Sequence, residues 1–131
     1  MQELIDIRTL PQHTRKEVIF GKIVRCIEGR SEGFTVKPNL DYPRRGYLVG
    51  TGWHEKTFNK DNIKTIRNHI NQIFNTLGDK KGLYIGGWNN KGECVVEISE
   101  GFERLDNALE IGRERNQISI WDVENEVEIK L

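Results

Sequence analysis

The sequence predicts an α+β fold: a single domain in which about three helices pack on a mainly antiparallel sheet. Two observations lead to this prediction. Apolar residues recur at helical spacing in three separate segments. Pairs of short strand-like runs, joined by turn-forming residues, lie between and after these segments. The length of 131 residues is that of one typical domain, so residues 1–131 are expected to form it together.

The first helix is expected to begin at Thr14. Thr14 and Glu17 have the capping-box spacing, in which both side chains accept hydrogen bonds from backbone amides at a helix start. Gly29 suits the left-handed position that follows a helix end. The apolar face between them comprises Ile19, Phe20, Ile23, Val24 and Ile27.

The second helix has the most regular pattern in the chain, with Asn59 or Asp61 expected to cap its start and Gly78 to end it. The third helix carries a narrower apolar stripe and is expected to end near Asn116. The two stripes are Ile63, Ile66, Ile70, Ile73, Phe74 and Leu77, and then Leu105, Ala108, Leu109 and Gly112.

Three pairs of strands are expected around these helices. Residues 33–36 and 46–50 flank a loop that contains Pro38 and Pro43, which are poor residues for a central strand. Residues 83–88 and 93–98 are separated by Asn89-Asn90-Lys91-Gly92, which suits a four-residue hairpin loop. The last pair is 117–121 and 127–131, and residues 4–7 are a candidate for one more strand. Because hairpins dominate, the sheet should be antiparallel with the helices on one face.

The composition excludes several classes of protein. Twenty basic and twenty acidic residues give no net charge, which argues against a nonspecific binder of duplex DNA. The chain has no apolar run of membrane-spanning length, and its start lacks a secretory signal pattern. Two cysteines, Cys26 and Cys94, are too few for a metal box or a disulfide framework and fit small, buried core residues. We therefore expect a soluble cytoplasmic protein with no membrane or nucleic-acid partner.

The charge is unevenly distributed along the chain. From Gly101 onward there are eight acids and four bases, whereas the first hundred residues hold twelve acids and sixteen bases. Such polarity can attract a second copy of the chain or focus a field on a small anion. The plain alternative is scatter over an ordinary surface. Together with the open strand edges of a short chain, the polarity predicts a homo-oligomer, at least a dimer.

Enzyme motifs fit the sequence poorly. His13, His54 and His69 lack metal-ligand spacing to one another or to cysteine or aspartate. His69 suits a partly exposed helix position, and His54 and Glu55 are neighbours that a strand would point to opposite faces. Nucleophile-elbow, Walker and dinucleotide motifs are missing. We therefore expect no catalytic residues, no metal site and no cofactor.

Two groups of residues suit ligand binding. Trp88 follows Gly86-Gly87, and an exposed indole stacks on a nucleobase for about 1–3 kcal/mol; a core tryptophan above a glycine gap is the alternative. Tyr84 and Asn89, on the same segment, complete this first group.

The second group is Arg113, Arg115 and Asn116 at the end of the third helix. Guanidinium groups bind phosphate oxygens through two hydrogen bonds at once. The alternative is that the arginines complement the helix dipole and pair with Glu110 or Glu114.

Three stretches together resemble a known family: residues 33–36 with 46–49, Gly86-Gly87-Trp88 before the strand-like 95–99, and most specifically residues 108–122. Over residues 33–131 the chain is similar to the first Thoeris anti-defence family, which are phage-type sponge proteins. The loop at 37–45 and the first thirty residues have no counterpart in this resemblance.

The resemblance implies a non-enzymatic protein that sequesters a cyclic ADP-ribose-type signal, or cyclic dinucleotides, in the cytoplasm of a host bacterium and so inhibits anti-phage defence. It also implies a homo-oligomer with ligand held between protomers by Trp88, Arg113, Arg115 and Asn116. Two alternatives remain: an inhibitor that binds a host defence protein such as a nuclease directly, and a small enzyme.

Overall fold

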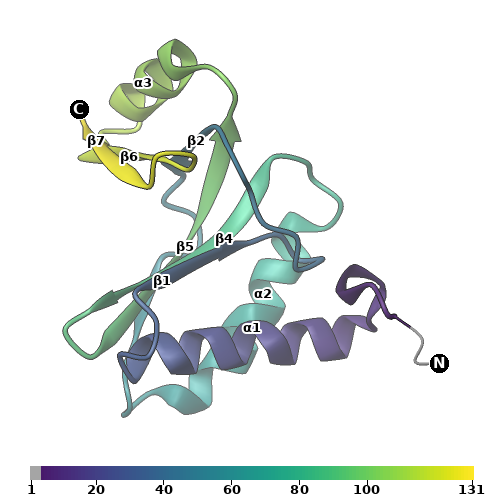
Figure 1. The fold of residues 1–131 in the computed structure, drawn as a ribbon. Helices are drawn as coiled ribbons and strands as arrows, with labels where there is room; N and C mark the ends of the chain where they lie inside the picture. Colours follow the sequence, from purple (N-terminus) through teal and green to yellow (C-terminus); the bar gives the residue numbers. More distant parts are fainter. Residues whose placement is uncertain (1–3) are drawn as a thin grey trace.

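A long hairpin of two strands, β4 (Leu83–Asn90) and β5 (Glu93–Phe102), forms the centre of the sheet in the computed structural model, which describes residues 4–131 (Figure 1). Lys91 and Gly92 join the strands with φ angles of 52° and 86°, the left-handed conformations that a two-residue hairpin turn requires. The strand order is β1-β4-β5-β2-β6-β7, with β3 also beside β5. Every strand pair in the described part of the chain is antiparallel.

The remaining elements are short. The strands are β1 (Gly33–Val36), β2 (Tyr47–Gly50), β3 (Lys56–Phe58), β6 (Ser119–Asp122) and β7 (Val127–Lys130). The α-helices are α1 (Gln12–Ile27), α2 (Ile66–Leu77) and α3 (Leu105–Glu114), and two 3₁₀ turns, η1 (Ile7–Thr9) and η2 (Ile63–Thr65), precede α1 and α2. The α+β fold class predicted from the sequence is confirmed.

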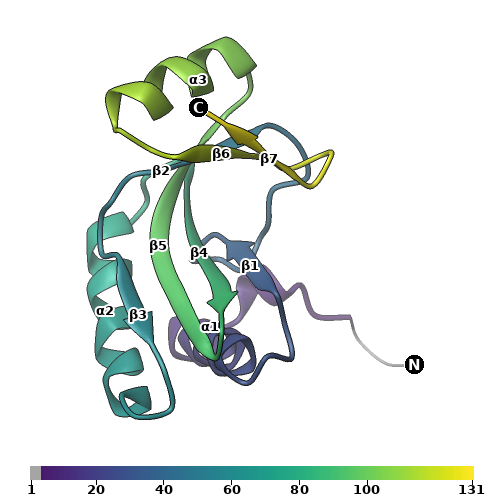
Figure 2. The same cartoon turned by 90° about the vertical axis from the view of Figure 1, so that its left-hand side faces the viewer.

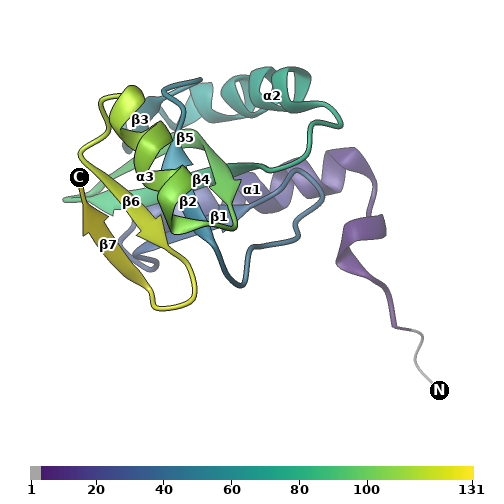
Figure 3. The same ribbon diagram turned by 90° about the horizontal axis from the view of Figure 1, so that it is seen from above.

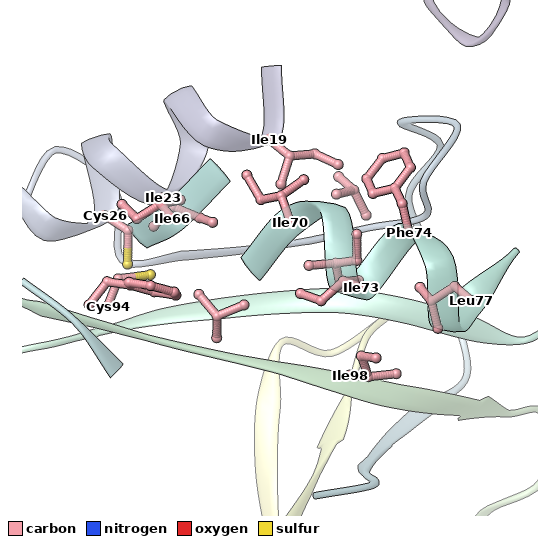
Figure 4. Packing of buried hydrophobic residues seen from close by; sticks show 14 of the residues in the cluster. Ile19, Ile23, Cys26, Ile66, Ile70, Ile73, Phe74, Leu77, Cys94 and Ile98 are labelled. Atoms are coloured by element: carbon pink, nitrogen blue, oxygen red, sulfur yellow. The ribbon is translucent and has the colours of Figure 1, made fainter. Parts of the chain in front are cut away.

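Helices α1 and α2 cover one face of the β1-β4-β5-β3 part of the sheet (Figures 1 and 2). The main core lies between them, and Figure 4 shows how its aliphatic side chains interlock above β5. Its fully buried members include Ile19, Ile23, Ile66, Ile70, Ile73, Ile85, Val96 and Ile98. Burying an aliphatic side chain of this size stabilises the fold by about 1.5–3 kcal/mol.

Helix α3 packs on a second, smaller core at the other end of the sheet, above β2 and β6 (Figures 1 and 2). Gly112 lets the helix approach closely: a Cβ at this position would lie 2.8 Å from Leu131 Cδ1 and 3.1 Å from Ile120 Cγ2. Val49, which also belongs to this core, pairs with Glu100 on β5. Ile98, in the main core, and Glu100, beside Val49 of the smaller core, are two residues apart on β5, so their side chains point to the same face of the sheet. All three helices therefore cover that face.

The opposite face of the sheet forms a second surface, which we call the open face. It comprises Thr35, Tyr84, Gly86, Trp88, Val95, Glu97, Ser99 and Gly101. None of these residues belongs to either buried core in the described chain.

The starts of the first two helices differ from expectation. Helix α1 begins at Gln12 after Pro11, so Thr14 lies inside the first turn and forms no capping box. The Glu17 carboxylate instead pairs with Arg67 of α2 at 2.9 Å. The helix ends agree: Gly29 and Gly78 follow α1 and α2 with φ angles of 76° and 49°.

Before α2, the expected caps are engaged in a turn of their own. Asn59 Oδ1 accepts a hydrogen bond from the Asp61 amide at 2.8 Å, and Asn62 Oδ1 accepts one from the Asn59 amide at 2.7 Å. The 3₁₀ turn η2 then leads into α2, which has no side-chain cap.

Two of the strand predictions also need correction, and one strand was missed. Residues 4–7 form no strand; Ile7 instead begins η1, where Asp6 caps the turn. The loop of the central hairpin has two residues rather than four, because Asn89 and Asn90 still pair with Cys94 and Glu93. Strand β3 was not expected. None of the helices in residues 4–131 combines the length and the apolar character needed to cross a bilayer.

Both cysteines are fully buried, as expected, and their sulfur atoms lie next to each other between α1 and β5 (Figure 4). Burial raises the pKa of the Cys26 thiol and of the Cys94 thiol, because a thiolate is poorly solvated in the core. The two groups therefore behave as small apolar residues at neutral pH.

We predict that neither thiol reacts with a thiol reagent until the protein is unfolded by denaturant. Replacing Cys94 by Ser should lower the free energy of unfolding by about 1–3 kcal/mol, since a hydroxyl costs more to bury in an apolar core than a thiol does. Cys94→Ala, which introduces no polar atom, is the matched control and should cost less. Urea unfolding followed by circular dichroism measures both, and rapid labelling of the folded protein would contradict the prediction.

Candidate functional site

An open groove of about 760 Å³ lies where the open face meets the loop between β1 and β2. Its floor is formed by Tyr84 of β4 and Gly101 of β5, and its walls come from the segment before β2 and the turn after β6. The lining residues are Pro43, Arg44, Arg45, Gly46, Tyr47, Leu48, Gly82, Tyr84, Gly101, Phe102, Glu103, Asp122 and Glu124. The volume is within the range of small-molecule sites in proteins.

Two glycines shape the groove. Gly46 has a φ of 89°, and a Cβ there would lie 2.8 Å from the Phe102 carbonyl oxygen. Only glycine combines this conformation with so close an approach, and the two residues before it, Arg44 and Arg45, line the rim of the groove. A Cβ on Gly101 would lie 3.0 Å from Cε2 of Tyr84, so the tyrosine ring lies across the glycine.

Charged side chains of both signs lie near the tyrosine. The ammonium group of Lys37 is 5.6 Å from the centre of the Tyr84 ring, a cation–π distance. Burial, and secondarily the charge of Asp41, raises the pKa of the Tyr84 hydroxyl. Tyr84 therefore keeps its proton at neutral pH and offers a hydrogen-bond donor as well as a flat ring.

The two arginines of the rim differ in their partners. Arg44 stacks on Tyr42, with 4.6 Å between its guanidinium carbon and the ring centre, and pairs with Asp41 at 3.7 Å. Arg45 is exposed and forms no ion pair with any residue in 4–131. It is thus the rim guanidinium best able to accept an anionic ligand.

Acidic residues line the other wall. Asp122 is buried, and its carboxylate accepts hydrogen bonds from the side chain and backbone of Asn125 at 2.9 and 3.2 Å. These bonds hold the pKa of Asp122 below its ordinary value. Glu103 and Glu124 are exposed. The groove therefore offers cations on one side and hydrogen-bond acceptors on the other.

Trp88 lies on the open face, beyond the groove. Its side chain is 47% exposed, so the alternative of a core tryptophan is wrong. The glycines before it differ in role. A Cβ on Gly87 would collide with the ring of Phe34 at 2.4 Å, whereas one on Gly86 would meet only ordinary contacts. Gly87 makes room for the core, and Gly86 leaves a flat floor between two aromatic residues.

Tyr84, Gly86 and Trp88 form one row on the open face, and the two aromatic residues are about 13 Å apart along the strand. Each ring is thus a separate stacking surface. Glu97, across from Gly86, has a raised pKa because it is partly buried and lies near Glu55. The row connects the groove to Trp88.

Asn89 points to the helix side. Its amide donates a hydrogen bond to the Cys26 carbonyl oxygen at 2.7 Å, and its backbone amide donates to Glu32 at 2.9 Å. These bonds attach the end of α1 to the hairpin.

The arginine-rich end of α3 has three residues in three environments. Arg115 pairs with Glu100 at 2.5 Å and is partly buried. Arg113 is exposed, with no hydrogen bond or ion pair from its side chain within residues 4–131. Asn116 has a φ of 55° and its amide donates to Arg113, while Gln117 donates to Gly112, the pattern that ends many helices.

Within one copy of the chain, the two predicted groups do not meet. Trp88 pairs with Val95 on β5, whereas Arg115 contacts Glu100, about 17 Å farther along that strand. In addition, the Glu100 side chain lies on the face of the sheet that the helices cover, whereas the Trp88 side chain lies on the open face. Tyr84 and Trp88 are the predicted site residues that share one surface.

One polar cluster was not foreseen. A Cβ on Gly50 would lie 2.7 Å from Gln117 Oε1 and 3.0 Å from Glu97 Oε2, so both side chains approach the backbone of β2 closely. The glycine in the strand-like segment 46–50 was the available signal, since a strand glycine often marks such an approach.

Two of the histidines, His54 and His69, lie in contact with each other. His69 is buried, not partly exposed as expected, and its Nε2 donates to the backbone oxygen of His54 at 2.7 Å. His54 in turn forms a 2.6 Å hydrogen bond with Thr76. In residues 4–131, no three His, Cys, Asp or Glu side chains are grouped so as to hold a metal ion.

The comparisons with known proteins add no relationship: no protein-family model, curated protein or solved structure matches the chain.

Burial holds the pKa of His69 below its ordinary value of 6.5, and this predicts a pH dependence of stability. The native state favours neutral His69, so the unfolded chain binds the proton more readily as the pH falls below 6.5. The free energy of unfolding should therefore decrease from neutral to mildly acidic pH.

His69→Gln keeps a donor for the His54 carbonyl group but does not titrate, so the decrease should be smaller in this variant. Urea unfolding across this pH range measures the difference. Equal pH profiles for the two proteins would contradict the assignment to His69.

Proposed function

We propose that the protein binds a cyclic nucleotide without converting it, and that the groove and the adjoining open face hold the ligand. The observation that supports this most directly is the combination of Tyr84 on the floor with exposed Arg45 on the rim. An aromatic ring accepts a nucleobase by stacking, and a guanidinium group binds phosphate oxygens through paired hydrogen bonds.

Several further features fit the same ligand class. Trp88 offers a second stacking surface, and the carboxylates of Glu103 and Glu124 suit ribose hydroxyls. The sequence resemblance extends the proposal to a role: sequestering a cyclic ADP-ribose-type signal, or a cyclic dinucleotide, in the bacterial cytoplasm and so inhibiting anti-phage defence. A protein of this kind is not an enzyme and needs no cofactor.

Arg113 and Arg115 enter this proposal only through a second copy. Neither arginine lines the groove of its own chain, so we propose that an arginine of α3 reaches a ligand there from a neighbouring protomer. Arg113, which is exposed, is the better candidate of the two, because Arg115 already pairs with Glu100. The proposal therefore includes a homo-oligomer.

Direct inhibition of a host defence protein is the second candidate function. The exposed apolar residues of the C-terminal hairpin favour it, with Ile118 81% and Val127 48% exposed. Such residues are typical of protein-binding surfaces.

Calorimetry with cyclic ADP-ribose isomers and cyclic dinucleotides separates these functions. A nucleotide-binding protein gives a saturable signal with at least one of them, and mass spectrometry recovers the nucleotide unchanged after denaturation. Recovery of a converted product would identify an enzyme, and the absence of binding across the series would favour the protein inhibitor.

We predict that Tyr84→Ala and Arg45→Lys each weaken nucleotide binding. Loss of a stacked base is worth about 1–3 kcal/mol, and loss of a charged hydrogen bond about 1.5–3 kcal/mol. Each variant should therefore bind from about fivefold to somewhat over a hundredfold more weakly. Arg67→Lys on α2 is the matched control and should bind as the parent does. Unchanged binding by both groove variants would exclude the groove.

The two arginines of α3 should respond differently to replacement by lysine. Arg115→Lys removes part of the contact with Glu100, so it should lower the melting temperature more than Arg113→Lys does. Arg113→Lys should leave the melting temperature unchanged, and it should weaken nucleotide binding if α3 of a neighbouring protomer contributes to the site. Thermal unfolding and calorimetry measure the two effects. Equal melting temperatures would show that the Arg115 pair does not stabilise the fold.

A further inference from the structure

We propose that a hollow between the end of α1 and the start of β1 is a binding site for a small anion that carries a diphosphate group. The chain turns back here from the helix into the strand (Figures 1 and 3). The hollow has a volume of about 340 Å³ and shares no lining residue with the groove beside Tyr84. Its lining residues are Lys22, Arg25, Arg30, Ser31, Gly33 and Phe34. The proposal does not depend on nucleotide binding in the groove.

The hollow is positively charged. Lys22 and Arg25 are neighbours on α1, one turn apart, so their like charges repel. Arg30 adds a third base from the segment that follows the helix. Among residues 4–131, no acidic side chain lines the hollow, and neither Glu28 nor Glu32 forms an ion pair with these bases. An anion bound here would relieve the repulsion.

The three bases have no partner in the part of the chain that the structure describes. None of their side chains forms an ion pair or a hydrogen bond with residues 4–131. Most other arginines have partners. Ion pairs are formed by Arg8, Arg44, Arg67, Arg104 and Arg115, and Arg15 donates to two backbone carbonyl oxygens. Lys22, Arg25 and Arg30 are therefore available to a ligand.

The end of α1 does not use these side chains as caps. Basic residues near a helix C-terminus can donate to its last carbonyl groups and complement its dipole. Here those carbonyl groups have other donors. The Arg25 carbonyl oxygen accepts a hydrogen bond from the Arg30 amide at 2.9 Å. The Cys26 carbonyl oxygen accepts one from the Gly29 amide at 3.1 Å and one from the Asn89 side chain at 2.7 Å.

The first residue of β1 adds a backbone donor to the hollow. The Glu32 carbonyl oxygen accepts a hydrogen bond from the Asn89 amide at 2.9 Å, so the backbone groups of Glu32 face β4. Because consecutive residues of a strand direct these groups to opposite sides, those of Gly33 face away from β4. The Ser31 hydroxyl donates to the Gly33 carbonyl oxygen at 3.0 Å. The Gly33 amide is then the outward-facing group left for a ligand.

These donors fit a diphosphate group. Guanidinium groups bind phosphate oxygens through two hydrogen bonds at once, and a lysine adds a compact charge. A single phosphate group on a molecule carries about 1.5–2 negative charges, fewer than the three bases supply. Two linked phosphates balance the site better. The volume is near the lower end of the range for small-molecule sites, which favours a small ligand. Inorganic pyrophosphate and a nucleoside diphosphate share the required group.

Inorganic pyrophosphate is the probe that tests the site, titrated without divalent cations at about 0.15 M ionic strength, where screening weakens nonspecific attraction. Calorimetry should show saturable binding that is tighter for pyrophosphate than for orthophosphate. In NMR spectra of the parent, pyrophosphate should shift the amide signals of Ser31 and Gly33, whereas those of Gly46 and Gly101 in the groove should stay in place. ADP followed at the same signals distinguishes the source: tighter binding identifies a nucleotide, and equal or weaker binding identifies free diphosphate.

Substitutions test the role of the bases. Arg25→Gln and Arg30→Gln should each weaken pyrophosphate binding by about tenfold to somewhat over a hundredfold. Arg30→Lys keeps the charge but not the paired hydrogen bonds, so its affinity should lie between those of the parent and Arg30→Gln. Lys60→Gln, at an exposed position before η2, is the matched control and should bind as the parent does. Circular dichroism shows whether each variant is folded.

Three results would overturn the proposal. They are no saturable binding of pyrophosphate by the parent, signals that shift in the groove instead of the hollow, and folded glutamine variants that bind as the parent does. The NMR experiment uses the parent, so it locates the binding even where a variant fails to fold. Binding of cyclic nucleotides is measured separately, and its failure would not affect this site.

Discussion

The register between β4 and β5 is the constraint on which the rest of the structure depends. Side chains alternate along both strands, so a slip of β5 by one residue against β4 would turn Glu97 toward the core and Ile98 toward solvent. The two-residue turn at Lys91 and Gly92 fixes this register, because both residues hold the left-handed conformation. Gly87 fits the same register, since a Cβ there would lie 3.1 Å from Cys94 Sγ on β5.

The same register attaches the first helix. Asn89 is the last inward-facing residue of β4, and so its amide reaches the Cys26 carbonyl group at the end of α1. The final carbonyl groups of a helix lack partners within the helix and need them from elsewhere. The helix end also uses its own following residues: the amides of Gly29 and Arg30 donate to Cys26 and Arg25. Helix, hairpin and core are therefore positioned by one set of backbone contacts.

The sequence predicted the elements whose signals are local and repeated. The apolar spacing from Ile63 to Leu77 identified the second helix, and the alternation of Cys94, Val96 and Ile98 identified the buried side of β5. Strand β3 escaped because it has three residues, too few to show a period. The helix starts were misplaced because a capping residue is defined by the geometry of the turn that it closes, which composition alone does not give.

The candidate site likewise contains residues whose positions follow from local sequence spacing and residues whose positions do not. Tyr84 and Trp88 share a face because they are four residues apart on one strand, and this follows from the sequence alone. The position of Arg45 does not follow from the sequence. Arg45 comes after a loop with two prolines, and its position depends on how that loop crosses the sheet. The contact of Arg115 with Glu100 likewise depends on where α3 docks. Sequence spacing relates residues within one element, and tertiary packing decides what lies beside them.

An antiparallel sheet separates the two proposed roles. Its helix side is filled by two cores, and its open face carries the aromatic row and the groove. Adding a strand to an edge uses backbone hydrogen bonds in the plane of the sheet, whereas a stacked ligand contacts side chains above that plane. A copy added at a sheet edge and a ligand bound beside Tyr84 of β4 therefore contact different groups of the protein. A second copy at an edge leaves the open face that carries Tyr84 accessible.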